Sequence, residues 1–348
     1  MQAVYFLGDR EIELRQVEDP TPGPGEVVLE IKASGMCGSD LKFYRTKGGP
    51  AAFGLGGDGN PVIAGHEPCG VVVAVGSEVA SRVAHEGMRV MNHHYSGCGV
   101  CPHCSTGWAQ MCNEGSVVYG VTGNGAHARY MKVPADTLVT LPQDLSFQAG
   151  AAISCGTGTA FGAIRRLELN GTETMAVFGQ GPVGLSATQL GTAMGARVIA
   201  LDVGQERLQR AKEFGAAALI DASDDNVVEQ LLALTGGLGV DCAMDCSSSS
   251  QARSQAIKAT RKWGKVAFVG EGGDVTIDVS NDMLRKQMTI LGSWTFSKQW
   301  QADCARFIAE REVAVDELFT HSWRLSQAIE AYQLFDAQTS GKGVLIPD

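Results

Sequence analysis

The stretch from residue 35 to residue 67 carries the side chains from which a catalytic metal centre is built. It begins with Cys37 and Ser39 in the run Gly-Met-Cys-Gly-Ser-Asp and ends with the adjacent His66 and Glu67. Thiolate, imidazole and carboxylate are the ligands of catalytic zinc, which keeps one position open for water or substrate. Either motif alone is a weak signal, so the prediction depends on further motifs later in the chain.

A cluster of four cysteines is the most specific pattern in the sequence. Its spacing is C-x2-C-x2-C-x7-C, with glycine and proline between the cysteines. Four thiolates close a tetrahedral site without an open position, which suits a structural zinc ion rather than a catalytic one. An iron–sulfur cluster or a pair of disulfides would use the same residue type and remains an alternative. The predicted structural ligands are Cys98, Cys101, Cys104 and Cys112.

A glycine-rich turn comes after the apolar run 175–178 and opens a helix-like segment. G-x-G-x-x-G between a strand and a helix is typical of dinucleotide binding: its glycines allow a tight turn, close backbone approach to the pyrophosphate, and helix packing on the sheet. A proline at the first helical position and the free N–H groups of a helix N-terminus fit this interpretation. The predicted cofactor-binding residues of the turn are Gly179, Gly181, Pro182, Val183 and Gly184.

The next strand-like run, 197–202, ends in Asp202, about where a ribose-binding acid is expected. Its carboxylate can accept hydrogen bonds from both ribose hydroxyls and would repel a 2′-phosphate. The next residues, Val203 and Gly204, supply no compensating arginine. The sequence therefore predicts NAD rather than NADP.

Two kinds of segment must position these residues. Residues 1–150 contain short β-type runs separated by glycine and proline, which indicates a mostly antiparallel β domain. From Gly171 onward, strand-like and helix-like segments alternate, which predicts a doubly wound parallel sheet with helices on both faces. The β-type runs are Glu26–Ala33, Pro68–Val75, Arg89–Met91 and Ala128–Val133, and the amphipathic stretches of the last part are 301–311 and 326–334.

These patterns predict a catalytic zinc-binding domain at 1–150, a dinucleotide-binding domain at 151–292 and a further C-terminal part at 293–348. Residues 54–60 are almost all turn formers and predict an exposed loop, either a cover for the active site or a simple surface insertion.

Bulk properties restrict the partners. A net charge of -10 disfavours nucleic acid, because phosphate binding needs a basic face. No apolar run approaches the roughly 20 residues of a membrane span. The N-terminus shows no secretory signal, and bunched cysteines without an export signal indicate reduced metal ligands. We therefore expect a cytosolic protein without nucleic-acid or membrane partners.

In chain order, the possible ligands at 37–67, the four-cysteine cluster, an isolated Cys155 and the glycine-rich turn resemble the zinc-dependent medium-chain alcohol dehydrogenases, in their alcohol and polyol branch. The resemblance covers essentially all 348 residues. It implies a Rossmann domain, a GroES-like catalytic domain with a structural zinc lobe, and a C-terminal part that returns to the catalytic domain. It also implies a homo-oligomer, either a dimer or a tetramer.

The resemblance assigns roles to single residues near the catalytic zinc. Cys37, His66 and Cys155 match the ligand positions, and Glu67 either ligates zinc or stands behind it. Bound zinc lowers the pKa of a bound hydroxyl to about 7. Ser39 matches the residue that accepts the alcohol proton.

Lys42 occupies a position where relatives often have a relay histidine. We expect it to set the pH dependence or to bind a polar substrate group. Its neighbours Tyr44 and Arg45 either line the substrate pocket with it or face solvent.

The resemblance also implies further cofactor contacts. Arg207 matches a position that flanks the adenosine, and Val269 and Trp294 lie where relatives hold the nicotinamide ring. Cysteines and histidines without spacing partners are predicted to have ordinary structural roles, and histidines beside the four-cysteine cluster to lie at the surface or in hydrogen bonds. These residues are Cys69, Cys242, Cys246, Cys304, His85, His93, His94, His103, His127 and His321.

The predicted function is a zinc-dependent hydride transfer between NAD and a small-molecule secondary alcohol or polyol, giving the ketone or aldehyde. A threonine-type or aldehyde-reducing enzyme of the same architecture is one alternative. A catalytically silent NAD-binding protein is another, although such a protein has no need to keep Cys37, Ser39, His66, Glu67 and Cys155 together.

Overall fold

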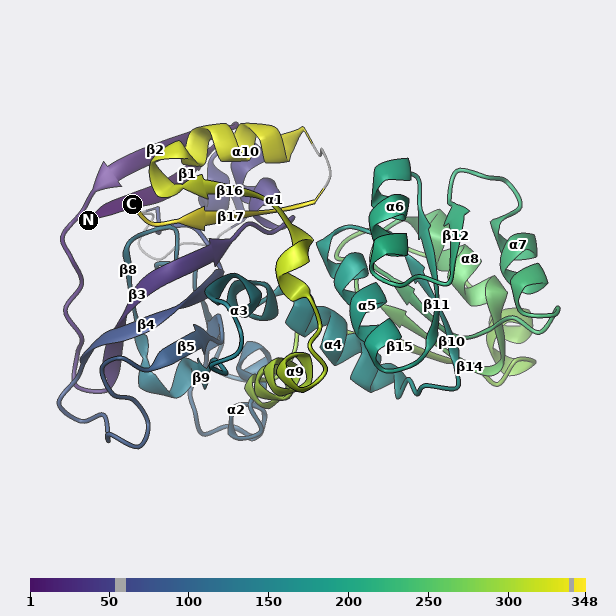
Figure 1. The fold of residues 1–348 in the computed structure, drawn as a ribbon, viewed down its shortest axis with the longest axis horizontal. Helices are drawn as coiled ribbons and strands as arrows, with labels where there is room; N and C mark the ends of the chain where they lie inside the picture. The colour runs from purple at the N-terminus through teal and green to yellow at the C-terminus, as the bar shows by residue number, and fades with distance from the viewer. Residues whose placement is uncertain (54–60, 338–340) are drawn as a thin grey trace. The chain divides into compact units, whose positions relative to one another are not determined.

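The computed structural model describes residues 1–53, 61–337 and 341–348, and the predicted loop at 54–60 lies outside these ranges. The described chain forms two compact units (Figure 1). Unit 1 consists of Met1–Gly158 and Phe296–Asp348, and unit 2 consists of Thr159–Thr295.

Unit 1 is built on a seven-stranded sheet in the order β16-β17-β3-β4-β5-β9, with β8 also paired to β3. All of its pairings are antiparallel except β16 with β17. The predicted mostly antiparallel β fold is therefore confirmed. The strands are β3 (Glu26–Gly35), β4 (Glu67–Val75), β5 (Arg89–Asn92), β8 (Tyr130–Pro134), β9 (Leu138–Thr140), β16 (Phe319–Arg324) and β17 (Lys342–Ile346).

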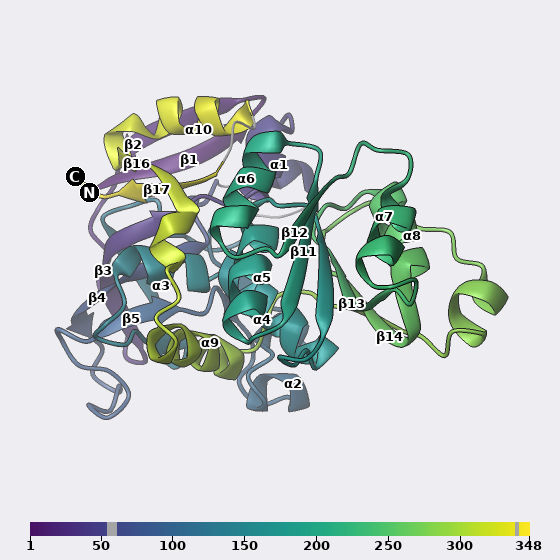
Figure 2. The same ribbon diagram turned by 45° about the vertical axis from the view of Figure 1, so that its right-hand side comes forward.

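The C-terminal segment completes this sheet. β17 pairs with β3 through Val344 opposite Gly35 and Leu345 opposite Ser34, just before Cys37. Helix α10 (Ala328–Asp336) lies beside strands β1 (Gln2–Gly8) and β2 (Glu11–Gln16) in both views (Figures 1 and 2). The last part of the chain thus reaches the segment that carries the first predicted zinc ligand.

Short helices surround the sheet of unit 1. Helix α3 (Phe147–Ile153) is capped by Ser146, whose Oγ accepts a hydrogen bond from the Ala149 N–H at 2.9 Å. No helix is predicted there from the sequence, nor at α4 (Gly156–Leu167), whose Gly-Thr-Gly-Thr start looks like a turn. The remaining elements of this unit are α1 (Asp40–Arg45), α2 (Pro102–Ser105), α3 (Phe147–Ile153), α9 (Lys298–Glu310), β6 (Tyr95–Ser96), β7 (Val117–Val118) and the short helices η1 (Gly49–Phe53), η2 (Ala109–Met111), η3 (Ala135–Thr137), η5 (Val315–Leu318) and η6 (Leu325–Gln327).

Unit 2 is a parallel sheet in the order β12-β11-β10-β13-β14-β15, the doubly wound arrangement that the alternation predicts. α5 and α6 cover one face and α7 and α8 the other (Figure 2). Four of the five residues of β10 are buried, because a central parallel strand is covered on both sides. The strands are β10 (Thr174–Phe178), β11 (Arg197–Asp202), β12 (Ala218–Asp221), β13 (Val240–Asp245), β14 (Thr260–Phe268) and β15 (Thr289–Gly292). The helices are α5 (Pro182–Ala193), α6 (Gln205–Glu213), α7 (Val227–Leu234), α8 (Ser250–Ala259) and η4 (Val279–Leu284), while α4 (Gly156–Leu167) contains the boundary between the units.

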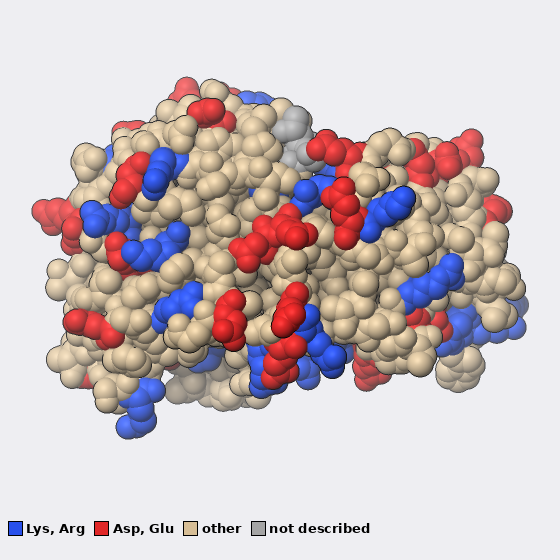
Figure 3. Space-filling model, in the orientation of Figure 1, with Lys and Arg blue, Asp and Glu red and all other residues tan. Residues whose placement is uncertain are grey.

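Charged side chains do not segregate by sign on the face drawn in Figure 3, where described Lys and Arg residues alternate with Asp and Glu. Among the described helices, none is both long and apolar enough to span a membrane.

Candidate functional site

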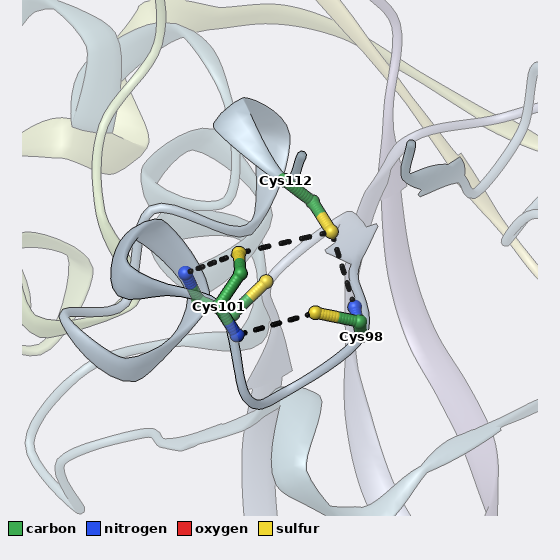
Figure 4. Close-up of side chains that lie close together, drawn as sticks. Cys98, Cys101 and Cys112 are labelled. Carbon is green, nitrogen blue, oxygen red and sulfur yellow. Dashed lines mark hydrogen bonds between the residues drawn. The ribbon is translucent and has the colours of Figure 1, made fainter. Parts of the chain in front are cut away.

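The four-cysteine cluster forms a compact lobe around α2 (Figure 4). The sulfur atoms of its four cysteines all lie within 4.8 Å of one another. Backbone N–H groups point at the sulfurs: the Cys98 N–H donates to Cys112 at 3.3 Å, and the Cys101 N–H to Cys98 at 3.3 Å. The Cys104 N–H, which donates to Cys101, helps to lower the pKa of the Cys101 thiol to about 6. Four such sulfurs fit a closed tetrahedral zinc site.

A second cluster brings together residues that are far apart in the sequence. The possible ligand atoms of Cys37, His66, Glu67 and Cys155 also lie within 4.8 Å of one another. The sulfurs of Cys37 and Cys155 are 3.9 Å apart although 118 positions separate them. Cys37 comes after β3, His66 and Glu67 stand at the start of β4, and Cys155 directly precedes α4. One metal ion could therefore contact all four side chains.

The polar environment of this cluster fits a metal. Glu67 is fully buried, and its Oε1 atom has no hydrogen-bond partner among the described residues. A hydrogen bond from Cys155 and the charge of His66 hold the pKa of the Cys37 thiol well below its usual value, against the opposing effect of burial. A buried carboxylate oxygen without a partner and a readily ionised thiol are the groups that a cation would satisfy.

Asp40, which no sequence motif singled out, orients the imidazole of this cluster. Its Oδ1 atom lies 2.9 Å from Nδ1 of His66, which leaves the opposite ring nitrogen for a metal. That nitrogen, Nε2, lies 3.2 Å from Oγ of Ser39. Asp40 stands three positions after Cys37 and begins α1, and its Oδ2 accepts a hydrogen bond from the Cys37 N–H at 2.9 Å. A buried acid so close to a candidate ligand is the signal that could have identified it.

Lys342 is a second residue that sequence reasoning missed. Its ammonium lies 2.6 Å from Oε2 of Glu67 and donates to the Met36 carbonyl at 3.1 Å. Both charged side chains are almost completely inaccessible, at 2% and 0% exposure. Burial raises the pKa of Glu67 to about 8, and the Lys342 ammonium opposes this rise. The lysine thus holds the carboxyl in place beside the thiolates.

The residues near Lys42 differ in their surroundings. Tyr44 is buried in a hydrophobic cluster, so a solvent-facing position is wrong for it, whereas the Arg45 side chain is 35% exposed and forms an ion pair with Asp336. Lys42 itself is exposed, with its ammonium 4.8 Å from the centre of the Phe53 ring. Packing of Tyr44 in the core directs this side of α1 away from solvent.

The histidines near the clusters are mostly internal. His93 and His94 are buried and each makes a hydrogen bond, which is the second of the two predicted alternatives. Nδ1 of His94 lies 2.8 Å from the Ser154 carbonyl, and its ring centre is 5.5 Å from that of His66. His85 and His103 are exposed, His127 is buried, and His321 stacks on Trp323. Cys69, Cys242 and Cys304 are buried thiols as predicted, whereas Cys246 is half-buried.

The glycine-rich turn of unit 2 has the geometry that a dinucleotide needs. Gly179 has φ +89°, and a Cβ on Gly184 would lie 1.8 Å from the Gly179 carbonyl oxygen. A Cβ on Gly181 would contact nothing within 4 Å, so the backbone there is open to a ligand. Pro182 and Val183 form the first turn of α5, with Gly181 at its N-cap. These features leave the N–H groups at the start of the helix available to phosphate.

Asp202 is held at the carboxyl end of β11. Its Oδ2 accepts a hydrogen bond from the Gln180 N–H at 2.6 Å, and its Oδ1 accepts one from the Gly204 N–H at 2.8 Å. Positions 203 and 204 hold no arginine, but Arg207 of α6 places its Nη1 atom 3.7 Å from Oδ1 of Asp202. The backbone N–H of Val269 donates to the Asp245 carbonyl at 2.9 Å, and Trp294 is 49% exposed.

The fold and the two sites define a class: a dehydrogenase with a β unit that carries two candidate metal clusters and a unit that carries a dinucleotide turn. Family models agree with it. Residues 23–143 match the alcohol dehydrogenase GroES-like domain, and residues 182–310 match the zinc-binding dehydrogenase domain.

Full-length relatives make the assignment specific. The chain is 39% identical over 353 residues to the uncharacterized zinc-type alcohol dehydrogenase-like protein YphC of Escherichia coli (strain K12), covering 100% of this chain and 99% of the relative. It is 32% identical to the erythritol/L-threitol dehydrogenase of Mycolicibacterium smegmatis, covering 100% and 98%. Alcohol dehydrogenase TADH from Thermus sp. ATN1 superposes with a TM-score of 0.90 at 26% identity, covering 100% of both chains.

The chain therefore belongs to the zinc-dependent medium-chain alcohol dehydrogenase family. The predicted family, fold class and zinc-dependent dehydrogenase activity are confirmed.

Proposed function

We propose that this enzyme oxidises a secondary alcohol or polyol with NAD, and reduces the corresponding ketone or aldehyde in the reverse direction. The observation that carries the proposal is the 3.9 Å separation of the Cys37 and Cys155 sulfurs beside His66. The M. smegmatis relative is named for two polyols, which supports a hydroxyl-rich substrate.

Cys37, His66 and Cys155 are the proposed ligands of a catalytic zinc ion, with Glu67 as a fourth ligand or a group directly behind the metal. When bound there, zinc acidifies the alcohol hydroxyl and polarises the carbonyl of the product. Asp40 orients His66, and Lys342 pairs with Oε2 of Glu67 while it donates to the Met36 carbonyl.

Ser39 is the proposed acceptor of the alcohol proton. Its Oγ atom is 3.2 Å from Nε2 of His66, so it adjoins the position that the substrate oxygen would occupy. A hydroxyl can accept one proton while it donates its own, which suits it to pass charge onward. We further propose that exposed Lys42 binds a polar substrate group or sets the pH dependence.

In unit 2, the proposed NAD contacts are the turn Gly179–Gly184, Asp202, Arg207, Val269 and Trp294. Bound NAD would accept the hydride from the substrate carbon. The two backbone N–H groups that hold Asp202 fix its carboxylate for ribose hydroxyls. The same charge would repel the 2′-phosphate of NADP.

The remaining assignments are structural. Cys98, Cys101, Cys104 and Cys112 are the proposed ligands of a structural zinc ion. We propose a homo-oligomer, dimeric or tetrameric, that works in the cytosol, where metal-binding thiols stay reduced.

A substrate screen with metal analysis tests the proposed function. Purified protein would be offered NAD with simple alcohols, polyols, sugar acids and amino-alcohols, and NADH fluorescence would report turnover. We expect two zinc ions per chain and activity with polyols or secondary alcohols. Activity with amino-alcohols alone would favour a threonine-type enzyme. One zinc ion and no turnover in either direction would favour a silent NAD-binding protein.

Asp202→Ala tests the cofactor assignment. Loss of the carboxylate removes the repulsion of a 2′-phosphate and leaves Arg207 free to bind it, so the ratio of kcat/KM for NAD over NADP should fall at least about tenfold, or about 1.4 kcal/mol. Asp221→Ala is the matched control, because Asp221 lies opposite Asp202 at the end of the neighbouring strand. An unchanged cofactor ratio in Asp202→Ala would refute the assignment.

A further inference from the structure

A chain of buried polar side chains extends from His66 away from the metal cluster. The first link is Asp40, whose Oδ1 faces His66. On its other oxygen, Oδ2, Asp40 accepts a hydrogen bond from the Tyr332 hydroxyl at 3.0 Å. The Tyr332 hydroxyl lies 2.7 Å from Nε2 of His127, and Nδ1 of His127 lies 2.7 Å from the Ser34 hydroxyl. Ser34, His127 and Tyr332 are all at 0% exposure.

The hydrogen bonds of this chain of side chains run in one direction. The Tyr332 hydroxyl donates its proton to Oδ2 of Asp40. The Tyr332 oxygen then accepts from Nε2–H of His127, which is neutral because burial lowers its pKa to about 4. Nδ1 of His127 is left to accept the proton of Ser34. At the other end, Oδ1 of Asp40 lies 2.9 Å from Nδ1 of His66.

This arrangement fixes the orientation of the His66 ring. With Nδ1 turned toward Asp40, the ring presents Nε2 on the side of Ser39. That nitrogen is the one a metal ion beside Cys37 would use. The chain ends at the buried Ser34, so it offers no path for protons to solvent and acts by orientation.

We propose that Tyr332 and His127 are positioning residues of the catalytic metal site: they hold the Asp40 carboxyl group, and through it they hold the His66 ring in the orientation that binds zinc. This inference rests on the proposed function, because it assumes that the cluster around Cys37 binds zinc.

Aromatic packing makes Tyr332 a rigid support. Its ring centre lies 4.9 Å from that of Phe6 and 5.8 Å from that of Tyr44. Its helix, α10, is anchored at Asp336 by ion pairs with Arg10 and Arg45. Helix α10 thus holds Tyr332 in place, and Tyr332 in turn holds Asp40 beside the candidate ligand His66.

Tyr332→Phe is the direct test, because it keeps the ring and removes only the hydroxyl. Residues that hold a metal ligand without touching the metal commonly contribute 10- to 100-fold to metal affinity. We therefore expect about a tenfold or greater loss of affinity at the catalytic site, measured by competition with a chromophoric chelator. Zinc at the four-cysteine cluster should be unaffected. Replacement of the catalytic zinc by Co²⁺ should give a shifted absorption spectrum in the variant.

Tyr44→Phe is the matched control, since Tyr44 belongs to the same hydrophobic cluster but not to the series of hydrogen-bonded side chains from Asp40 to Ser34. It should retain the zinc affinity and the cobalt spectrum of the unmodified enzyme. Two His127 variants extend the test: His127→Phe should weaken zinc binding, and His127→Gln, which keeps a donor for Tyr332, should restore part of the loss.

The outcomes separate this inference from the proposed function. If the unmodified chain binds no zinc at the Cys37 cluster, the proposed function is wrong. If it binds two zinc ions and Tyr332→Phe matches Tyr44→Phe in affinity and spectrum, the positioning role is wrong. Should Tyr332→Phe fail to fold, the His127 pair decides, and equal zinc affinity in both variants and the unmodified enzyme would overturn the inference.

Discussion

The two candidate metal clusters of unit 1 differ in where their ligands come from in the sequence. The four cysteines of the α2 lobe come from a single short segment, and their sulfurs accept hydrogen bonds from backbone N–H groups of that same segment. The cluster at Cys37 draws its side chains from three separate places in the chain. His66 and Glu67 there are buried, whereas none of the four cysteines of the lobe is.

The surroundings of the clusters differ in the same way. In the lobe, Gly and Pro would let the backbone wrap around an ion, and four sulfur ligands would leave no coordination position open. Around Cys37, the side chains of Asp40, Lys342 and Tyr332 hold the possible ligands from behind. A cluster from one short segment suits a structural metal site. A cluster whose ligands come from distant segments and are held by further side chains suits a catalytic metal site, because those side chains can adjust its geometry and charge.

The largest effect that separates the clusters should come from Cys37→Ser. Loss of the catalytic metal should lower kcat/KM at least about 1,000-fold, which corresponds to about 4 kcal/mol of transition-state stabilisation. Zinc content should fall from two to one per chain, with little change in the unfolding temperature. A variant that keeps most of its activity would show that the two clusters do not divide the roles as described.

Cys101→Ser should produce the reverse pattern. Loss of a metal is among the few single changes that cost more than about 4 kcal/mol of stability. We expect a clear fall in the unfolding temperature, while the fraction that remains folded keeps a kcat within a few-fold of the unmodified enzyme. A thermal melt measures the unfolding temperature, and active-site titration measures the folded fraction to which kcat is referred. A stable variant with a greatly reduced kcat would contradict the assignment of the lobe as structural.

Lys342→Met should have the smallest of the three effects and sharpens the contrast in supporting layers. Removing one partner of a buried ion pair usually costs about 3–5 kcal/mol, because the other charge stays buried and unpaired. We expect the free energy of unfolding to fall by about 3 kcal/mol, the lower end of that range, because a zinc ion near Glu67 would compensate part of the lost charge. The double variant Lys342→Met/Glu67→Gln should recover stability. If it is no more stable than Lys342→Met alone, the two residues do not act as a pair.

Much of unit 2 could be predicted from its sequence, because its signals are local. The turn Gly179–Gly184 lies between β10 and α5, where the G-x-G-x-x-G pattern places it, and the alternating segments form the expected parallel sheet. The four-cysteine lobe could be predicted equally well, since its four cysteines lie within one short segment of the sequence. Each of these features depends on residues that are neighbours in the chain.

The supporting layer of the Cys37 cluster could not be predicted from the same reasoning. Lys342 stands in an apolar strand and Tyr332 in an amphipathic helix, where a lysine and a tyrosine carry no motif. The pairing of β17 with β3 and the packing of Tyr332 against Phe6 bring this part of the chain to the metal cluster. The helices α3 and α4 were missed for a different reason: their residues around Cys155 are mostly small and turn-like, and their helical form depends on burial within the fold.

The late position of β17 and α10 has a consequence for biosynthesis. Lys342 donates to the Met36 carbonyl across a separation of 306 positions. A nascent chain that has emerged as far as Trp300 already contains all four candidate ligands of the catalytic cluster but neither Tyr332 nor Lys342. The candidate ligands are thus translated before these two supporting groups, and Lys342 reaches them through the pairing of β17 with β3.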